Sequence, residues 1–315
     1  MSQEIPAFHD LPLQGGDPPF SAWGLWENNQ LGALNHLTDE NVLKAAQEIK
    51  TASLDLDAIN PPLLGRVGFE HKLIKKAPRT INDDVISFNT QGGSQWDSFR
   101  HFAYQADKKF YCGVTQDDIH GEPKSAVNGI GQWAKMAIAG RGILIDYCDW
   151  AKERNISYEK LSTHAIPLED IKSIIKERNL TIDKSCVQGD ILFIRTGYME
   201  AYKQLDSVGC EEVKTRFAWP GIGQSLETTE WLWKSQFAAV AADSPAFECT
   251  PCVDEKNLLH QILLAGWGTP IGELFDLETL SEICKKNNRW SFFFTSVPLN
   301  YSGAVASPPN ALAIF

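Results

Sequence analysis

The stretch that decides the fold is Gln91-Gly-Gly-Ser-Gln95-Trp-Asp97-Ser-Phe-Arg100-His101-Phe102, which follows a short apolar run at 85–88. It gathers amide and ionisable side chains directly after an expected strand. Gln95 and Asp97 would share a face of an extended backbone, whereas Asp97 and His101 would share a face of a helix. The two glycines near its start let the backbone approach a ligand closely. The segment therefore indicates a ligand site or, with equal weight, a helix N-terminus whose histidine is satisfied by a hydrogen bond.

A second group of polar residues lies late in the chain. His260 falls in an expected helix, and Glu273 follows across a turn that contains Gly266 and Gly268. A histidine and a carboxylate joined in this way can converge on the site formed by the first stretch. Taken alone, a helix histidine is more often a packed core residue.

Composition excludes several classes of protein. The chain has 315 residues, of which 43% are hydrophobic and 22% charged, so it has the composition of a folded globular protein and not of a disordered one. It carries 29 Lys and Arg against 40 Asp and Glu, a formal charge of -11. Such a surface repels phosphate backbones and anionic lipid, so we expect neither nucleic acid nor a membrane as partner.

The compartment is predicted from the N-terminus and the cysteines. No run approaches the roughly 18 apolar residues of a membrane span. Residues 1–20 contain three acidic residues and four prolines and lack the apolar core of a secretory signal. The seven cysteines have no regular spacing, which is typical of reduced thiols. We therefore expect a soluble cytoplasmic protein.

Familiar catalytic motifs are absent from the sequence or incomplete. There is no Walker-type loop, no His-Glu-x-x-His zinc motif and no Gly-x-Ser-x-Gly elbow. Gly221-Ile-Gly223 and Gly266-Trp-Gly268 lack the third glycine of a dinucleotide-binding loop, so we interpret them as turn glycines. Cys249-Thr-Pro-Cys252 has no second pair to complete a zinc site, which favours a loop with two reduced thiols over a redox or metal centre.

Helical and strand patterns alternate along the chain. Apolar residues at helical spacing predict helices opened by Thr38, over 42–49, and by Pro167, and further helices at 225–234, 255–264 and 277–286, the last with Asp276 as candidate cap. Apolar or β-rich runs predict strands at 85–88, 142–147, 190–196, 237–242 and 291–297. Several of these runs are apolar on both faces, as in the middle of a covered sheet. The order predicts one α/β or α+β domain, preceded by an arm of roughly 30 residues.

Together the two polar groups resemble the cyclase family that includes bacterial kynurenine formamidase and isatin hydrolase, and more closely its fungal-type branch of secondary metabolism. The bacterial motif runs His-x-Gly-Thr-His-x-Asp, then a proline and His-Phe. Here the aligned stretch keeps the second glycine, Asp97 and His101-Phe102, whereas Gln91 and Gln95 replace the two earlier histidines. Further matching segments span nearly the whole chain, at 23–26, 31–35, 140–146, 189–197, 239–245, 259–273 and 307–310.

The resemblance implies a fold and an assignment of roles. The fold is a single α/β domain of the swivelling β/β/α type, with an N-terminal arm at 1–35 and a catalytic domain at 36–315. In the hydrolytic relatives, the two motif histidines, the aspartate, and a later histidine and glutamate bind divalent metal. The last motif histidine transfers a proton and falls on His101. The ligand positions fall on Gln91, Gln95, Asp97, His260 and Glu273.

The two glutamines change the expected metal chemistry. A neutral amide oxygen is a weaker and harder ligand than imidazole and suits Mn²⁺ or Mg²⁺ better than Zn²⁺. Two interpretations stay open. Asp97, His260 and Glu273 hold one divalent metal (Mn, Mg or Zn) with Gln95 assisting, or the site is metal-free and the carboxyl groups of Asp97 and Glu273 share a proton.

These residues predict an enzyme acting on a small carbonyl- or amide-bearing metabolite. His101 would transfer the proton, while Asp97 and Glu273 would stabilise developing charge. Weak metal binding favours a cyclase or dehydratase that forms a ring or adds or removes water. The alternatives are a metal-dependent hydrolase of amides, lactams or lactones, and a non-catalytic ligand-binding protein. The side chains expected to contact substrate are Gln91, Trp96, Arg100, Trp23 and Trp26.

The resemblance also implies a homodimer or homotetramer. In the relatives the N-terminal arm reaches toward a neighbouring subunit. Here the arm carries Trp23 and Trp26 in a setting rich in proline and glycine that we expect to be unable to bury them itself.

Overall fold

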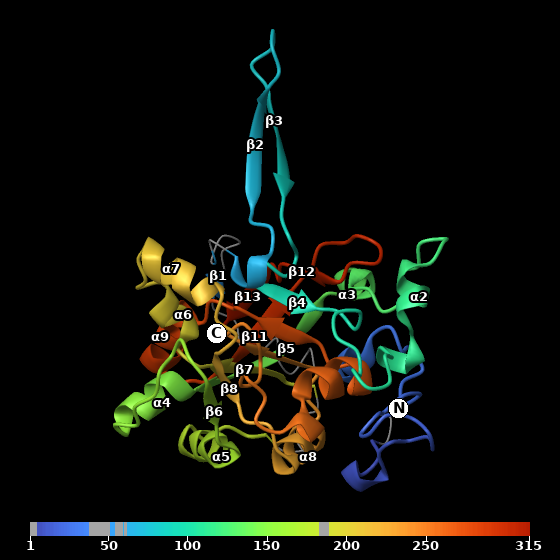
Figure 1. Cartoon of the computed structure of the whole chain (residues 1–315). Coiled ribbons are helices and arrows are strands. Elements are labelled where there is room, and N and C mark those ends of the chain that lie inside the picture. Colours follow the sequence, from blue (N-terminus) through green and yellow to red (C-terminus); the bar gives the residue numbers. More distant parts are fainter. Residues whose placement is uncertain (1–4, 38–50, 54–58, 60–61, 183–188) are drawn as a thin grey trace.

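The computed structural model describes residues 5–37, 51–53, 59, 62–182 and 189–315, and Figure 1 shows the chain as a ribbon. The helix expected over 42–49 lies outside these residues. Among the described residues, no helix is long and apolar enough to cross a membrane.

A mixed sheet of nine strands forms the centre of the described structure, in the order β1-β13-β11-β5-β7-β9-β10-β4-β12. The four central strands β5, β7, β9 and β10 are parallel, and the flanking strands run antiparallel to their neighbours. In sheet order the strands are Thr51–Ser53, Ala311–Ile314, Ser291–Ser296, Ile138–Asp146, Ile191–Arg195, Ala239–Ala242, Ile271–Glu273, Gln95–Asp97 and Ala306–Ser307.

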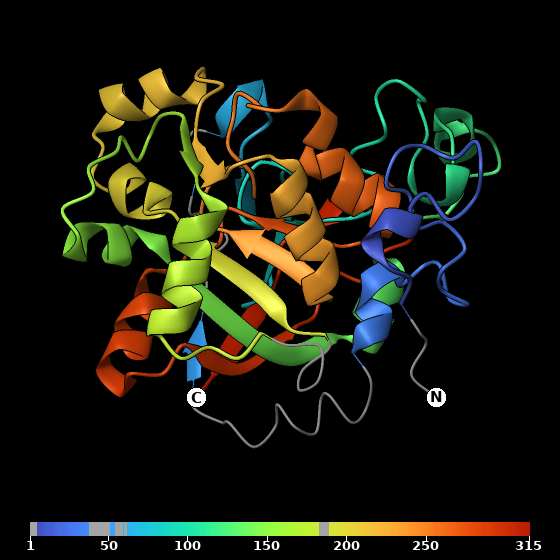
Figure 2. The ribbon, with the colours of Figure 1, turned by 90° about the horizontal axis from the view of Figure 1, so that it is seen from below.

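The central strands lie where the apolar runs at 142–147, 190–196 and 237–242 predict them, and β11 confirms the run at 291–297. Every residue of β7 and β9 is buried, because the sheet is covered on both faces. Figure 2 shows α5 (Leu168–Glu177) and α8 (Leu226–Ser235) lying across one face of the sheet. This covering explains why these strands are apolar without alternation.

The strand expected at 85–88 is present but lies outside the main sheet. It belongs to β3 (Asn82–Ser87), which pairs with β2 (Glu70–Lys75) in a hairpin that projects from the body of the molecule (Figure 1). All six residues of β3 are exposed. The expected strand is therefore confirmed, but it is exposed and the polar stretch follows a projecting hairpin. A third small sheet pairs β6 (His164–Ile166) with β8 (Pro220–Ile222).

The helices begin close to their predicted starts. Pro167 immediately precedes α5, and the Ser225 hydroxyl accepts the Thr228 N–H at the start of α8. Leu277 occupies the cap of α9 (Glu278–Asn287), while Asp276 accepts the Glu278 N–H. The other α-helices in the described parts of the chain are α2 Gln116–His120, α3 Gly131–Met136, α4 Tyr147–Glu153, α6 Tyr198–Tyr202 and α7 Ser207–Lys214.

The segment 255–264 does not form the single helix that its spacing predicts. A 3₁₀ turn spans Glu255–Asn257, and a π-helix spans Gln261–Trp267. Leu258 between them has an extended backbone. A buried carboxylate from elsewhere in the chain, Glu248, accepts the N–H groups of Leu259 and His260 and so starts a new helix at this point.

The N-terminal arm packs against its own chain. The Trp23 indole donates to the Ala265 carbonyl at 2.7 Å, and the Trp267 indole donates to the Phe20 carbonyl at 2.8 Å. Trp23 and Trp26 are 8% and 7% exposed. The expectation that the arm could not bury these rings is therefore wrong, and for Trp23 the π-helix supplies the carbonyl partner. This burial removes the sequence argument for a homodimer or homotetramer, which stays a prediction.

Close packing in the sheet gives a prediction for Gly142 in β5. A Cβ there would lie 2.2 Å from Cε2 of Phe292, its partner on β11. Gly142→Ala should therefore lower the free energy of unfolding by about 1–3 kcal/mol, measured by denaturant titration. Gly15→Ala is the control, because no heavy atom lies within 4 Å of its added Cβ, and it should change stability by less than about 0.5 kcal/mol. Equal stability of the two variants would contradict this packing.

Candidate active site

The site is built on the antiparallel pairing of β4 with β10. The register places Gln95 opposite Glu273 and Asp97 opposite Ile271. Side chains alternate along a strand, so Gln95 and Asp97 share one face while Trp96 points to the other. Both polar side chains are fully buried, at 0% exposure. The strands therefore bring the late glutamate and the early polar stretch to one place.

Two glutamine amides hold the two carboxylates. The Gln95 amide nitrogen donates to Glu273 Oε2 at 2.6 Å, and the Gln91 amide nitrogen donates to Asp97 Oδ1. The Gln95 amide nitrogen also donates to the side-chain oxygen Oε1 of Gln91 at 3.3 Å. These amides therefore act as donors to the carboxylates that the resemblance assigns to a metal shell.

His260 lies between two carboxylates. Its Nε2 is 2.9 Å from Glu273 Oε1, and its Nδ1 is 2.9 Å from Glu248 Oε1. Burial would lower the pKa of His260, but the hydrogen bonds to Glu248 and then Glu273 raise it well above its ordinary value. Both ring nitrogens face acceptors, so the ring is an imidazolium in this arrangement.

Glu248 is the residue of this group that sequence reasoning missed. It is 2% exposed and follows β9 by a loop. A single glutamate in an irregular segment has no periodicity or spacing that would separate it from surface acids.

His101 faces the same cluster. Its ring centroid lies 6.4 Å from that of His260, and Phe102 packs edge-on against His260 at 5.4 Å. Burial first, then the positive charges of His260 and Arg66, lower the pKa of His101 to about 3. The imidazole is therefore neutral near pH 7, although the lowered pKa makes it a weak base in this environment.

The pKa of Asp97 is shifted in the opposite direction. Burial, reinforced by repulsion from Glu273, raises the pKa of Asp97 well above its ordinary value. Its Oδ1 accepts from Gln91, whereas its Oδ2 is buried without a hydrogen-bond partner among the described residues. That oxygen is free to act on a ligand, either as a carboxylic acid or as a metal ligand.

The donor set fits one divalent cation. Asp97, His101 and His260 each offer a ligand atom, and these atoms lie within 4.8 Å of one another. The unpartnered Oδ2 of Asp97 and the unpartnered Oε1 of Gln95 add two buried oxygens. For His260 to ligate a cation, its Nε2 would first have to release the proton that it shares with Glu273. The nitrogen and oxygen donors suit Mn²⁺ or Zn²⁺.

Trp96 is a core residue, contrary to the substrate contact expected from sequence. It is fully buried and packs against Phe275 and Phe294, and its indole donates to Ser296 Oγ at 3.0 Å. The alternation of β4 directs it away from the carboxylates, so substrate contact is not supported.

Arg100 is also engaged elsewhere. Its guanidinium donates to three backbone carbonyls, those of Val127, Ser125 and Gly303, at 2.5, 2.6 and 2.7 Å. These bonds tie two loops together and leave little capacity for binding a substrate. Trp23 likewise has its indole N–H bound to the π-helix.

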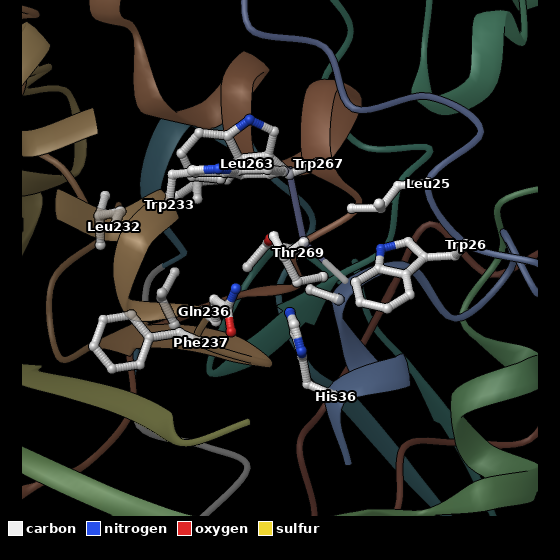
Figure 3. A pocket seen from close by; sticks show the side chains of 13 residues that line it. Leu25, Trp26, His36, Leu232, Trp233, Gln236, Phe237, Leu263, Trp267 and Thr269 are labelled. Carbon is white, nitrogen blue, oxygen red and sulfur yellow. The ribbon is translucent and has the colours of Figure 1, made fainter. Parts of the chain in front are cut away.

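Trp26 lines a small cavity of about 30 Å³, which Figure 3 shows from close by. His36, Gln236 and the rings of Trp233 and Trp267 surround it. None of the clustered carboxylates lines this cavity. A larger cavity of about 330 Å³ adjoins the loop that follows Gln91, and its lining includes Phe69, Phe88, Gly92, Gly93 and Ser94.

Comparisons with known proteins place the chain in a family. A family model described as "Putative cyclase" matches residues 5–249. The crystal structure of a novel cyclase is 30% identical, with a TM-score of 0.80, and the match covers 94% of this chain and 100% of that one. No curated protein matches the chain significantly.

Two more distant structures share the fold. Isatin hydrolase A from Ralstonia solanacearum is 14% identical with a TM-score of 0.55, covering 88% of this chain and 97% of that one. Isatin hydrolase A from Labrenzia aggregata, bound to benzyl benzoate, is 15% identical with a TM-score of 0.56, covering 90% and 98%. The extent of the family match and the 30% identity over nearly the whole chain show that this protein belongs to the cyclase family.

Proposed function

We propose that this protein catalyses acid/base-assisted ring formation, or addition or removal of water, on a small carbonyl- or amide-bearing metabolite of secondary metabolism. One observation carries the proposal. Asp97, His101 and His260 bring titratable atoms within 4.8 Å of one another beside Glu273. A neutral base and a protonated acid in one buried cluster are the components of concerted proton transfer.

The roles follow from the environments. His101, neutral near pH 7, accepts a proton from the substrate carbon or hydroxyl that loses it. Asp97, whose carboxyl tends to be protonated, donates from Oδ2 to the substrate oxygen that becomes a hydroxyl or leaves as water. Transfer in the reverse direction uses the same pair with roles exchanged. The Glu273 carboxylate raises the pKa of Asp97 and the His260 imidazolium lowers it, so these two groups set the electrostatic environment of Asp97.

Metal-dependent hydrolysis of an amide, lactam or lactone is the second candidate. The unpartnered Oδ2 of Asp97 favours it, as does the similarity in fold to isatin hydrolases. Asp97, His101 and His260, with Glu273 and Gln95 beside them, would hold the ion. A bound divalent cation would polarise a carbonyl or a water molecule. The two glutamine amides in place of imidazoles would weaken Zn²⁺ binding more than Mn²⁺ or Mg²⁺ binding.

Substitution of His101 tests the proposed base. We expect His101→Ala to lower kcat by about 10²–10⁴-fold while leaving the fold intact, because proton transfer contributes that factor. Turnover would be followed by mass spectrometry on a panel of hydroxyketones, amides and lactones. His71→Ala is the control, since His71 lies on the exposed hairpin and bonds only to Asp84 among the described residues. Undiminished turnover in His101→Ala would reject the role of His101.

Removal of divalent metal separates the two candidates. If acid/base chemistry dominates, exhaustive chelation should lower kcat by less than about tenfold, because His101 and Asp97 need no ion to transfer a proton. Metal content before and after chelation would be measured by plasma mass spectrometry. An inactive chelated enzyme that recovers fully with Mn²⁺ would instead establish metal-dependent chemistry, and a product gaining one water with cleavage of the amide or ester bond would identify it as hydrolysis.

A further inference from the structure

Glu248 contacts Nδ1 of His260, on the other side of the ring from Glu273, and accepts four hydrogen bonds. Its Oε1 accepts from the His260 backbone N–H at 2.6 Å and from the His260 ring Nδ1 at 2.9 Å. Its Oε2 accepts from the Leu259 N–H at 2.6 Å and from the Gln224 amide at 2.9 Å. Each oxygen thus has two donors, so the carboxylate has a single orientation.

Because all four neighbouring groups are hydrogen-bond donors, a neutral amide side chain would fit poorly in place of Glu248. All four neighbours of Glu248 donate, and a glutamine in its place would turn an amide N–H toward at least one of them. A carboxylate is therefore the group that this position requires.

Gly221 provides the space for Glu248. A Cβ on Gly221 would lie 2.3 Å from the Glu248 carbonyl carbon and 2.6 Å from the Cys249 nitrogen. The next residue, Ile222, forms a parallel bridge with Glu248. The segment Gly221-Ile-Gly223, whose glycines were predicted to serve a turn, lies in close backbone contact with the segment that contains Glu248. This contact holds the backbone of the buried glutamate in place.

We propose that Glu248 is a positioning residue that orients His260 in the active site. With Nδ1 held by Glu248, the ring directs Nε2 toward Glu273 and so fixes the carboxylate that neighbours Asp97. Carboxylates that bind the second nitrogen of a functional histidine have this effect on ring orientation and tautomer. The inference rests on the proposed function, because it assigns Glu248 to the same reaction.

A purely structural role for Glu248 makes a different prediction. If Glu248 only satisfied the N–H groups of Leu259 and His260 at the start of the π-helix, its replacement would lower stability but leave kcat of the folded variant unchanged. The kcat of a folded variant therefore separates orientation from capping, and a readout on the His260 ring reports whether the bond from Nδ1 to the carboxylate was altered.

The test is Glu248→Gln in the full chain labelled with ¹⁵N-histidine. At fixed neutral pH, the wild-type protein should show a hydrogen-bonded Nδ1–H proton resonance, assigned to His260 by its loss in His260→Gln. We expect Glu248→Gln to shift this resonance upfield or remove it, because an amide oxygen is a weaker acceptor than a carboxylate and the new amide N–H faces other donors. On a substrate found in the panel above, kcat should fall about 10–100-fold, with KM within about threefold.

Glu278→Gln is the matched control. Glu278 is a partly buried carboxylate that accepts from the Arg195 guanidinium at 2.6 and 3.0 Å, outside the active-site cluster. Its substitution should lower stability but leave the His260 resonance and kcat unchanged.

A folded Glu248→Gln protein that keeps the resonance at its wild-type position and retains kcat within twofold of wild type would overturn the proposal. If that variant does not fold, Glu248→Asp decides, because it keeps a carboxylate able to accept from Nδ1. A folded Glu248→Asp protein with the resonance supports orientation, and one without it contradicts orientation. The resonance does not depend on turnover, so undiminished activity of His101→Ala would reject the proposed function while leaving this test valid.

Discussion

The register between β4 and β10 is the constraint on which the whole site depends. It sets Gln95 opposite Glu273 and directs Asp97 to the same face. A slip of one residue would turn both side chains into the core and bring Trp96 into the site. The packing of Trp96 against Phe275 and Phe294 opposes this slip, because the ring fills the core on the other face. Hydrophobic packing on one side of β4 thus positions the polar groups on the other.

The site places three acidic side chains in a buried environment, which disfavours their charged forms. Asp97, Glu248 and Glu273 are at most 2% exposed, and one imidazolium lies among them. Burial of charged groups is tolerated only where hydrogen bonds replace water. Glutamine amides, backbone N–H groups and His260 supply those bonds here. Asp97 is the carboxylate that lacks a full set of these bonds, because its Oδ2 has no hydrogen-bond partner among the described residues. Burial and the nearby charge of Glu273 raise its pKa.

Local patterns predicted those parts of the fold that depend on local chemistry. The apolar runs gave the central strands, and Pro167 marked the start of α5. The π-helix could not be predicted from its own residues, because the carboxylate that starts it comes from Glu248 in another loop. Burial of Trp23 likewise depends on a carbonyl of the distant residue Ala265.

The sequence identified most of the residues that form the site, but it did not predict how they are arranged. Gln91, Gln95, Asp97, His101, His260 and Glu273 are the polar side chains that converge, whereas Glu248 carries no sequence signal. Trp96 and Arg100 were expected to bind substrate because they stand among polar residues. Strand alternation and the carbonyls of distant loops decide otherwise, and neither is visible in the order of residues.

The most direct test of the account is a crystal structure of the protein with a bound hydroxyketone or amide ligand. Our interpretation predicts the ligand oxygen within about 2.6–3.2 Å of Asp97 Oδ2, and a proton-bearing ligand atom at a similar distance from the His101 ring. A ligand bound elsewhere, with both groups out of reach, would contradict it.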